Sequence, residues 1–165
     1  GHIGQAVSRL QAVYPELRIV LVGIFNNSEW EKFHHLWRSP QAQSRIHQGL
    51  ARFDDGLRGL AQGKSGVAVF DDQNWFAGHW GSRRASGQPA YQAVRFGDRF
   101  EVRNTGGDEP SNATLADGHA GSVWNALWAQ AMVNLLVGQF GVPVAPLRTQ
   151  ELVHFVETVG RFGMR

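Results

Sequence analysis

The hydrophobic positions of this chain follow a helical period and then a strand-like run, and this order occurs twice. Residues 5–14 place apolar side chains at helical spacing, and Pro15 ends that run. The segment 18–25, RIVLVGIF, is a continuous aliphatic and β-branched stretch, which is typical of a buried strand. A helix joined to a strand by a short loop is the basic unit of an α/β fold.

The second occurrence begins at Ser39 and Pro40. This pair predicts a helix start, because serine caps the first free N–H groups and proline fits the first helical turn. Apolar side chains then recur at steps of four and three, and Gly63 ends the helix. The stretch GVAVF (66–70) predicts a second buried strand. The alternation predicts a mostly parallel sheet between helices, in a three-layer α/β/α arrangement.

The region 71–113 departs from this pattern. It is rich in Gly, Asp, Asn, Arg and aromatic residues, and we expect it to form an excursion over the strand ends. Within it, the alternation around Gly97 and Asp98 predicts a small β-hairpin at about 91–103 with a two-residue turn.

Two further helices are predicted from Ser122 and Thr149, because each residue can cap a helix and precedes an apolar stripe. The chain shows no internal repeat and no linker. Residues 1–165 therefore predict a single domain that is large enough to bury a core.

Composition removes several function classes. The chain has no cysteine, which excludes disulfides, thiol nucleophiles and cysteine-based zinc sites. The net charge is only +2 and the 16 basic residues are scattered, so we expect no nucleic-acid partner. The sequence contains no apolar run of about 18 residues, so we expect no membrane span.

The segment TLADGHAGSVWNALWAQ (114–130) places a carboxylate and an imidazole at the start of a predicted helix. In a hydrolytic triad, histidine takes the proton of the nucleophile and returns it to the leaving group, while a carboxylate orients the ring. Gly118 lets the backbone turn, so that Asp117 and His119 can reach one point. The alternative is an ordinary turn, with His119 as a helix-entry residue.

Polar residues also follow the first predicted strand, and sites in open α/β sheets gather at the carboxyl ends of the strands. Ser28 is the best local candidate for a nucleophile. Asn26 and Asn27 could donate hydrogen bonds to an oxyanion. The alternative for all three is turn and capping chemistry.

The segment DDQNWFAGHW (71–80) follows the second predicted strand. His79, His119 and one of the two aspartates of this segment could form a zinc site with a bound water, although no recognised metal-binding spacing supports it. Trp75 and Trp80 could stack on sugar rings or line an acyl pocket. The alternative is that these aromatic residues anchor the segment by hydrophobic contacts.

The segment LADGHAGSVWNALWAQAMVNLL (115–136) resembles the Asp-His block of the SGNH/GDSL hydrolases, a superfamily of serine esterases and acetylesterase-like enzymes. Residues 14–24 are similar to a core strand of that family with its preceding helix, and residues 52–71 to the next helix and strand. The likeness covers about residues 5–137, mainly as a pattern, and only the Asp-His motif is specific.

The resemblance implies that Asp117 orients His119, which serves a serine as general base and then as general acid. The spacing here is Asp-x-His instead of the family's usual Asp-x-x-His, a form found in its acetyltransferase-like and acetylesterase-like branches. The family's Gly-Asp-Ser and Gly-x-Asn-Asp blocks are absent from this sequence. The resemblance therefore implies that the nucleophile and the oxyanion donors belong to a missing N-terminal segment or to another chain. It also implies that the protein is secreted or periplasmic.

Together these observations predict a serine-type ester hydrolase or acyl transferase that acts on an acylated carbohydrate, a lipid or a small ester. Such a reaction requires no cofactor and no metal. Two alternatives stay open. One is a metal-dependent hydrolase built on His79 and His119. The other is a non-catalytic SGNH-like module that binds glycans or partners through Trp75 and Trp80.

Overall fold

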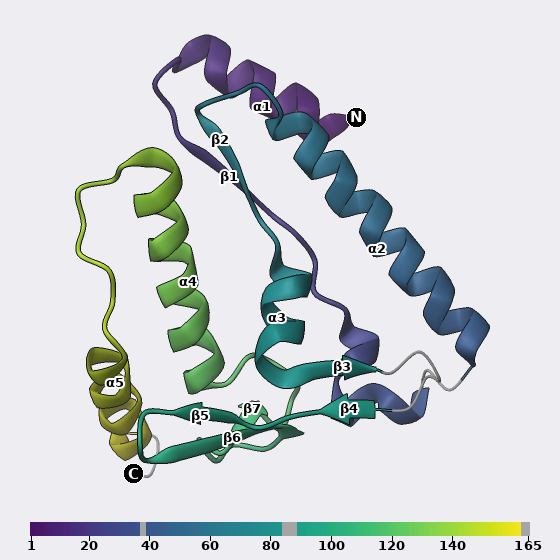
Figure 1. Cartoon of the computed structure of the whole chain (residues 1–165), viewed down its shortest axis with the longest axis vertical. Coiled ribbons are helices and arrows are strands. Elements are labelled where there is room, and N and C mark those ends of the chain that lie inside the picture. Colours follow the sequence, from purple (N-terminus) through teal and green to yellow (C-terminus); the bar gives the residue numbers. More distant parts are fainter. Residues whose placement is uncertain (37–38, 84–88, 163–165) are drawn as a thin grey trace.

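The computed structural model describes residues 1–36, 39–83 and 89–162 (Figure 1). Across these ranges the chain is an α/β structure with five α-helices and three small sheets. The α-helices are α1 (His2–Val13), α2 (Pro40–Ala61), α3 (Asp72–Trp80), α4 (Ser122–Phe140) and α5 (Thr149–Phe162). The strands are β1 (Ile19–Val22), β2 (Val67–Phe70), β3 (Gly81–Arg83), β4 (Pro89–Tyr91), β5 (Val94–Phe96), β6 (Phe100–Gly106) and β7 (Asn112–Thr114). The 3₁₀ helices are η1 (Asn27–Glu29) and η2 (Glu31–Leu36).

β1 and β2 form the parallel pair that the two apolar runs predict. Ile19 pairs with Val67 and Val22 pairs with Phe70. Figure 1 shows these strands between α2 and α4, and both helices contact β2. The strands are joined to α1 and α2 by a small apolar cluster formed by Val7, Leu21, Leu57 and Val67. Within the described ranges, no helix is long and apolar enough to cross a lipid bilayer.

β1 is less buried than the sequence predicts. Within the part of the chain that the structure describes, β1 pairs with β2 alone. Leu21 is buried, but Val22 and Ile24 are exposed by 39% and 50%. The prediction of a fully buried strand is therefore wrong for these two residues, because no other described strand covers the outer edge of β1.

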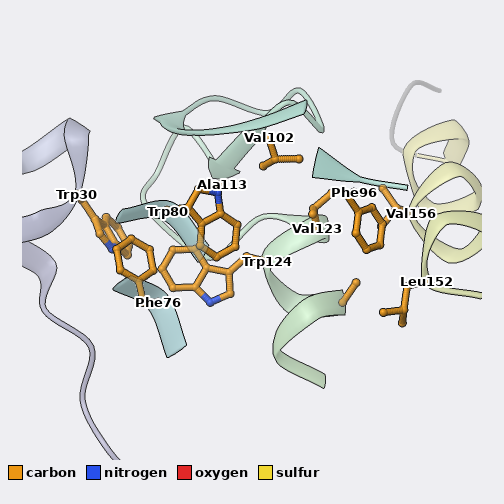
Figure 2. Packing of buried hydrophobic residues seen from close by; sticks show 11 residues of the cluster. Trp30, Phe76, Trp80, Phe96, Val102, Ala113, Val123, Trp124, Leu152 and Val156 are labelled. Atoms are coloured by element: carbon orange, nitrogen blue, oxygen red, sulfur yellow. The ribbon is translucent and has the colours of Figure 1, made fainter. Parts of the chain in front are cut away.

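The larger core contains a group of aromatic rings around Trp124 of α4, beside aliphatic residues (Figure 2). The ring centroids of Phe76 and Trp80, both on α3, lie 4.9 Å and 5.2 Å from that of Trp124. Trp30 approaches the same ring edge-on at 5.6 Å. Such large rings bury much apolar area and pack in defined geometries. The first turn of α4 therefore packs into this group of rings, and the preceding loop ends at this buried turn.

α3 occupies the start of the region 71–113, where we expect a loop. Asp71 caps this helix and accepts a hydrogen bond from the N–H of Asn74 at 3.0 Å. Phe76 and Trp80 are 1% and 0% exposed. Trp80 is therefore a core residue, and Asp72–Trp80 form a helix instead of the expected loop.

The hairpin expected at about 91–103 is formed by β5 and β6. Phe96 pairs with Phe100, so the turn has three residues instead of the expected two. Gly97 begins this turn with φ +60°, a conformation that glycine adopts easily. β7 then pairs with β6 in parallel, and the chain continues from β7 to α4.

The two longest helices begin differently. α2 begins at Pro40 after the cap Ser39, as predicted. The cap of α4 is Gly121, without a side-chain hydrogen bond. A Cβ atom on Gly121 would lie 3.0 Å from the carbonyl oxygen of Ala113 in β7. Because the two backbones approach so closely, position 121 favours a residue without a side chain. The cap of α4 is therefore Gly121 instead of the expected Ser122.

Candidate functional site

Asp117 and His119 lie in a tight loop between β7 and α4. The N–H of Leu115 donates to the carbonyl oxygen of His119 at 2.7 Å, which closes the loop. Gly118 has φ +95°, a left-handed conformation that favours glycine. The backbone therefore turns at Gly118 and brings the two flanking side chains together, as the sequence predicts.

The carboxylate of Asp117 contacts His119 twice. Its Oδ2 lies 2.9 Å from the ring Nδ1, and its Oδ1 accepts a hydrogen bond from the backbone N–H at 2.9 Å. A carboxylate only accepts hydrogen bonds, so Nδ1 carries the proton in this contact and Nε2 is the basic nitrogen of the neutral ring. A general base of the triad type uses this tautomer.

The Asp117–His119 pair is open to solvent. The side chain of His119 is 82% exposed and that of Asp117 is 62% exposed. Among the described residues, no hydrogen bond involves Nε2 of His119. Turn chemistry accounts for the backbone bond to Asp117, but it does not require the additional contact between carboxylate and ring. A group that approaches this loop therefore meets an oriented imidazole.

The predicted residues after β1 form a separate, buried network. Ser28 donates its N–H and its hydroxyl to Oδ1 of Asn26, at 3.0 Å and 2.7 Å. Asn26 and Ser28 are 0% and 2% exposed, whereas Asn27 is exposed at the start of η1. The hydroxyl of Ser28 is thus directed at Asn26 and not at His119. The roles of Ser28 as nucleophile and of Asn26 and Asn27 as oxyanion donors stay predictions.

A second carboxylate–imidazole contact belongs to this network. Nε2 of His47, on α2, lies 3.1 Å from Oε1 of Glu29 and 3.1 Å from Nδ2 of Asn26. Asn104 of β6 donates from Nδ2 to the backbone carbonyl of Glu29 at 3.1 Å. The network therefore joins the end of β1 to α2 and β6.

Acidic residues lie at the end of β2. Arg58 of α2 pairs with Asp71 at 2.9 Å, and Trp128 of α4 donates its indole N–H to Oδ1 of Asp72 at 3.0 Å. Burial raises the pKa of Asp72, against the hydrogen bond from Trp128. Burial and then the charge of Asp71 raise the pKa of Asp54 on α2. These contacts tie α2, α3 and α4 to the strand end.

His79 and Trp75 lie on α3 and contact each other. Nδ1 of His79 is 2.7 Å from the carbonyl oxygen of Trp75, and their rings are 4.8 Å apart. Trp75 also packs against Trp80 at 5.8 Å, and Trp80 is fully buried and cannot stack on a sugar. No three His, Asp or Glu side chains in the described ranges gather in a way that could hold a metal ion. The described residues therefore contain no ligand set for the zinc site considered above.

No motif in the sequence indicates Glu29, His47 or Asp54 as members of a polar network. Gln43, His47 and Asp54 recur at helical spacing along α2, and Gln43 and Asp54 are buried. Polar residues that recur on the inner face of a helix are the signal that could have indicated this polar face. No local pattern indicates Glu29.

No family model, no curated protein and no solved structure matches this chain. The resemblance to the SGNH hydrolases therefore stays a prediction. It rests on the residues of the Asp-His block.

Proposed function

We propose that this chain carries the acid–base pair of a serine-type ester hydrolase or acyl transferase. The observation that supports the proposal is the 2.9 Å contact between Nδ1 of His119 and Oδ2 of Asp117, on a ring that is 82% exposed. Such a carboxylate fixes the tautomer of the ring and stabilises the imidazolium that forms during the reaction. The substrate class is an acylated carbohydrate, a lipid or a small ester.

In the proposed reaction, Nε2 of His119 takes the proton of a serine hydroxyl while the serine oxygen attacks the ester carbonyl carbon. The imidazolium returns this proton to the leaving alcohol oxygen as the bond from that oxygen to the carbonyl carbon breaks, which leaves an acyl-serine. Water, or an acceptor alcohol in acyl transfer, then repeats both steps and releases the acid or the new ester. Asp117 stays ionised throughout, and no cofactor takes part.

The proposed serine belongs to a segment outside this sequence or to a second chain. Two observations favour this source over the local candidate. Ser28 is buried and its hydroxyl is directed at Asn26. His119, in contrast, is open to any group that reaches its loop. The oxyanion donors come from the same outside source in this proposal.

The proposal extends to the fold. The parallel pair β1–β2 is part of a three-layer α/β/α arrangement of the SGNH type. Two observations support this arrangement. α2 and α4 both contact β2, and the Asp-His loop directly precedes a helix, α4. In that family the block precedes the last helix, whereas α5 follows α4 in this chain.

Turnover of 4-nitrophenyl acetate tests the proposal in the longest form of the protein that can be produced. His119→Ala should lower kcat about 10³-fold or more, because the serine loses its base. His154→Ala is the matched control, since His154 is an exposed histidine on α5. It should keep the wild-type turnover. Full turnover by a folded His119→Ala variant would contradict the proposed function.

A further inference from the structure

Asp108 lies in the turn between β6 and β7 and reaches the Asp-His loop. Its Oδ1 accepts a hydrogen bond from the backbone N–H of Ala116 at 3.0 Å. Ala116 directly precedes Asp117 in the chain. The carboxylate of Asp108 therefore holds the backbone at the point where the chain enters the Asp117–His119 pair.

The turn that presents Asp108 is itself fixed by hydrogen bonds. The N–H of Asn112 donates to the carbonyl oxygen of Glu109 at 3.0 Å. The hydroxyl of Thr105, on β6, donates to Oδ1 of Asn112 at 2.6 Å. β6 and β7 pair on either side of this turn. Asp108 thus stands on a supported part of the backbone, where a side chain can set the position of a neighbouring loop.

The Asp117–His119 pair needs such support because both side chains are largely exposed, by 62% and 82%. An exposed ion pair contributes little free energy by itself, so hydrogen bonds to the surrounding backbone help to hold its geometry. Catalytic side chains depend on hydrogen-bonded neighbours that orient them. The two contacts of Asp117 to His119 require one orientation of its carboxylate. Asp108 holds the backbone on one side of Asp117, and the hydrogen bond from Leu115 to His119 closes the loop.

We propose that Asp108 is a positioning residue that acts through Asp117 on His119. Its role follows from the hydrogen bond to Ala116 and not from any contact with the reacting atoms. The proposal rests on the function proposed above. It adds a residue that nothing in the Asp-His motif indicates. The tautomer of the His119 ring reports this role without any measurement of turnover.

The kinetic test compares Asp108→Ala with Asp108→Asn. Asp108→Ala removes the acceptor and should lower kcat about tenfold with little change in KM, because substrate contacts are unaffected. Asp108→Asn keeps an acceptor oxygen and should restore most of kcat. Asp98→Ala is the control, because Asp98 is also an exposed aspartate in a turn. It should behave like the wild-type protein.

Two further measurements separate positioning from a general loss of stability. In an Asp117→Ala background, Asp108→Ala should cause no further loss, because its route to His119 is already broken. The ¹⁵N chemical shifts of the His119 ring should report the Nδ1–H tautomer in the wild-type protein, and a smaller share of it in Asp108→Ala. The Asn variant should restore that share.

The outcomes distinguish the two proposals. If His119→Ala abolishes turnover while Asp108→Ala changes neither kcat nor the ring tautomer, the role of Asp108 is overturned and the proposed function stands. If His119→Ala keeps full turnover, the proposed function fails. The tautomer measurement then still decides whether Asp108 positions the pair.

Discussion

Two carboxylate–imidazole contacts in this chain have the same chemistry and different surroundings. Asp117 and His119 meet at 2.9 Å with side chains that are 62% and 82% exposed. Glu29 and His47 meet at 3.1 Å with side chains that are 3% and 40% exposed. The first contact is made within one loop, and the second joins η1 to α2. The two contacts therefore differ most in their carboxylates, because Asp117 is open to solvent and Glu29 is buried.

The surroundings also determine where a substitution has its effect. An exposed ion pair contributes at most about 1 kcal/mol to stability. A change at Asp117 or His119 should therefore lower kcat and leave the free energy of unfolding almost unchanged. A buried carboxylate has lost its hydration, so a change in its partners should appear in the free energy of unfolding. Substitutions at the two contacts therefore test whether the contacts differ in this way.

The largest effect is expected for Asp117→Asn. The amide cannot stabilise the imidazolium and can present its NH₂ group to the ring, so kcat should fall about 10³- to 10⁴-fold. The free energy of unfolding in urea should stay within about 0.5 kcal/mol of the wild-type value, because Asp117 is exposed. Asp98→Asn is the control for both measurements. Unchanged turnover of the Asp117 variant would remove the distinction between the two contacts.

A smaller effect is expected for His47→Ala. This change removes one partner of the buried Glu29 and should lower the free energy of unfolding by about 2 kcal/mol. Urea denaturation measures this loss, with His154→Ala as the exposed control. The folded His47 variant should keep its turnover. A stability equal to that of the control would show that the buried network does not support the fold.

The smallest effect is expected for Asp54→Asn, and it should depend on pH. Burial raises the pKa of Asp54 above its ordinary value of 3.8, and its Oδ1 has no hydrogen-bond partner among the described residues. The folded state thus holds this proton more tightly than the unfolded chain. The stability that Asp54 contributes is present below pH 3.8 and is lost as the pH rises through the folded pKa.

Asp54→Asn should therefore raise the melting temperature near neutral pH and leave it unchanged in acid. Thermal unfolding at about pH 7.5 and about pH 3.5 measures the difference. Asp98→Asn makes the same substitution at an exposed aspartate in a turn and is the matched control. A variant that is less stable than the wild-type protein near neutral pH would mean that the ionised carboxylate is well satisfied where it lies.

Local sequence patterns predict those elements whose signals lie within a few residues. Ser39 and Pro40 indicate the start of α2, because capping acts between neighbours in the chain. α3 is missed because its aromatic residues pack into the core on several sides, so no apolar stripe stands against a polar one. The burial of β1 is overestimated because an apolar run does not reveal whether a strand lies at an edge.

The same limit applies to the candidate site. Asp117 and His119 can be predicted because one loop makes the whole contact. The contact of Glu29 with His47 depends on how α2 packs beside η1, which no local pattern encodes. The hydrogen bond from Ala116 to Asp108 likewise depends on the place of the β6–β7 turn.

Chemical rescue of His119→Gly by imidazole asks whether a base at this position carries the reaction. With 4-nitrophenyl acetate, the variant should be inactive alone, and imidazole should restore a saturable part of the turnover above the rate of imidazole without protein. His154→Gly should show normal turnover and no gain with imidazole. If folded His119→Gly is as active as the wild-type protein, or stays inactive at every imidazole concentration, the assignment of His119 as the base is contradicted.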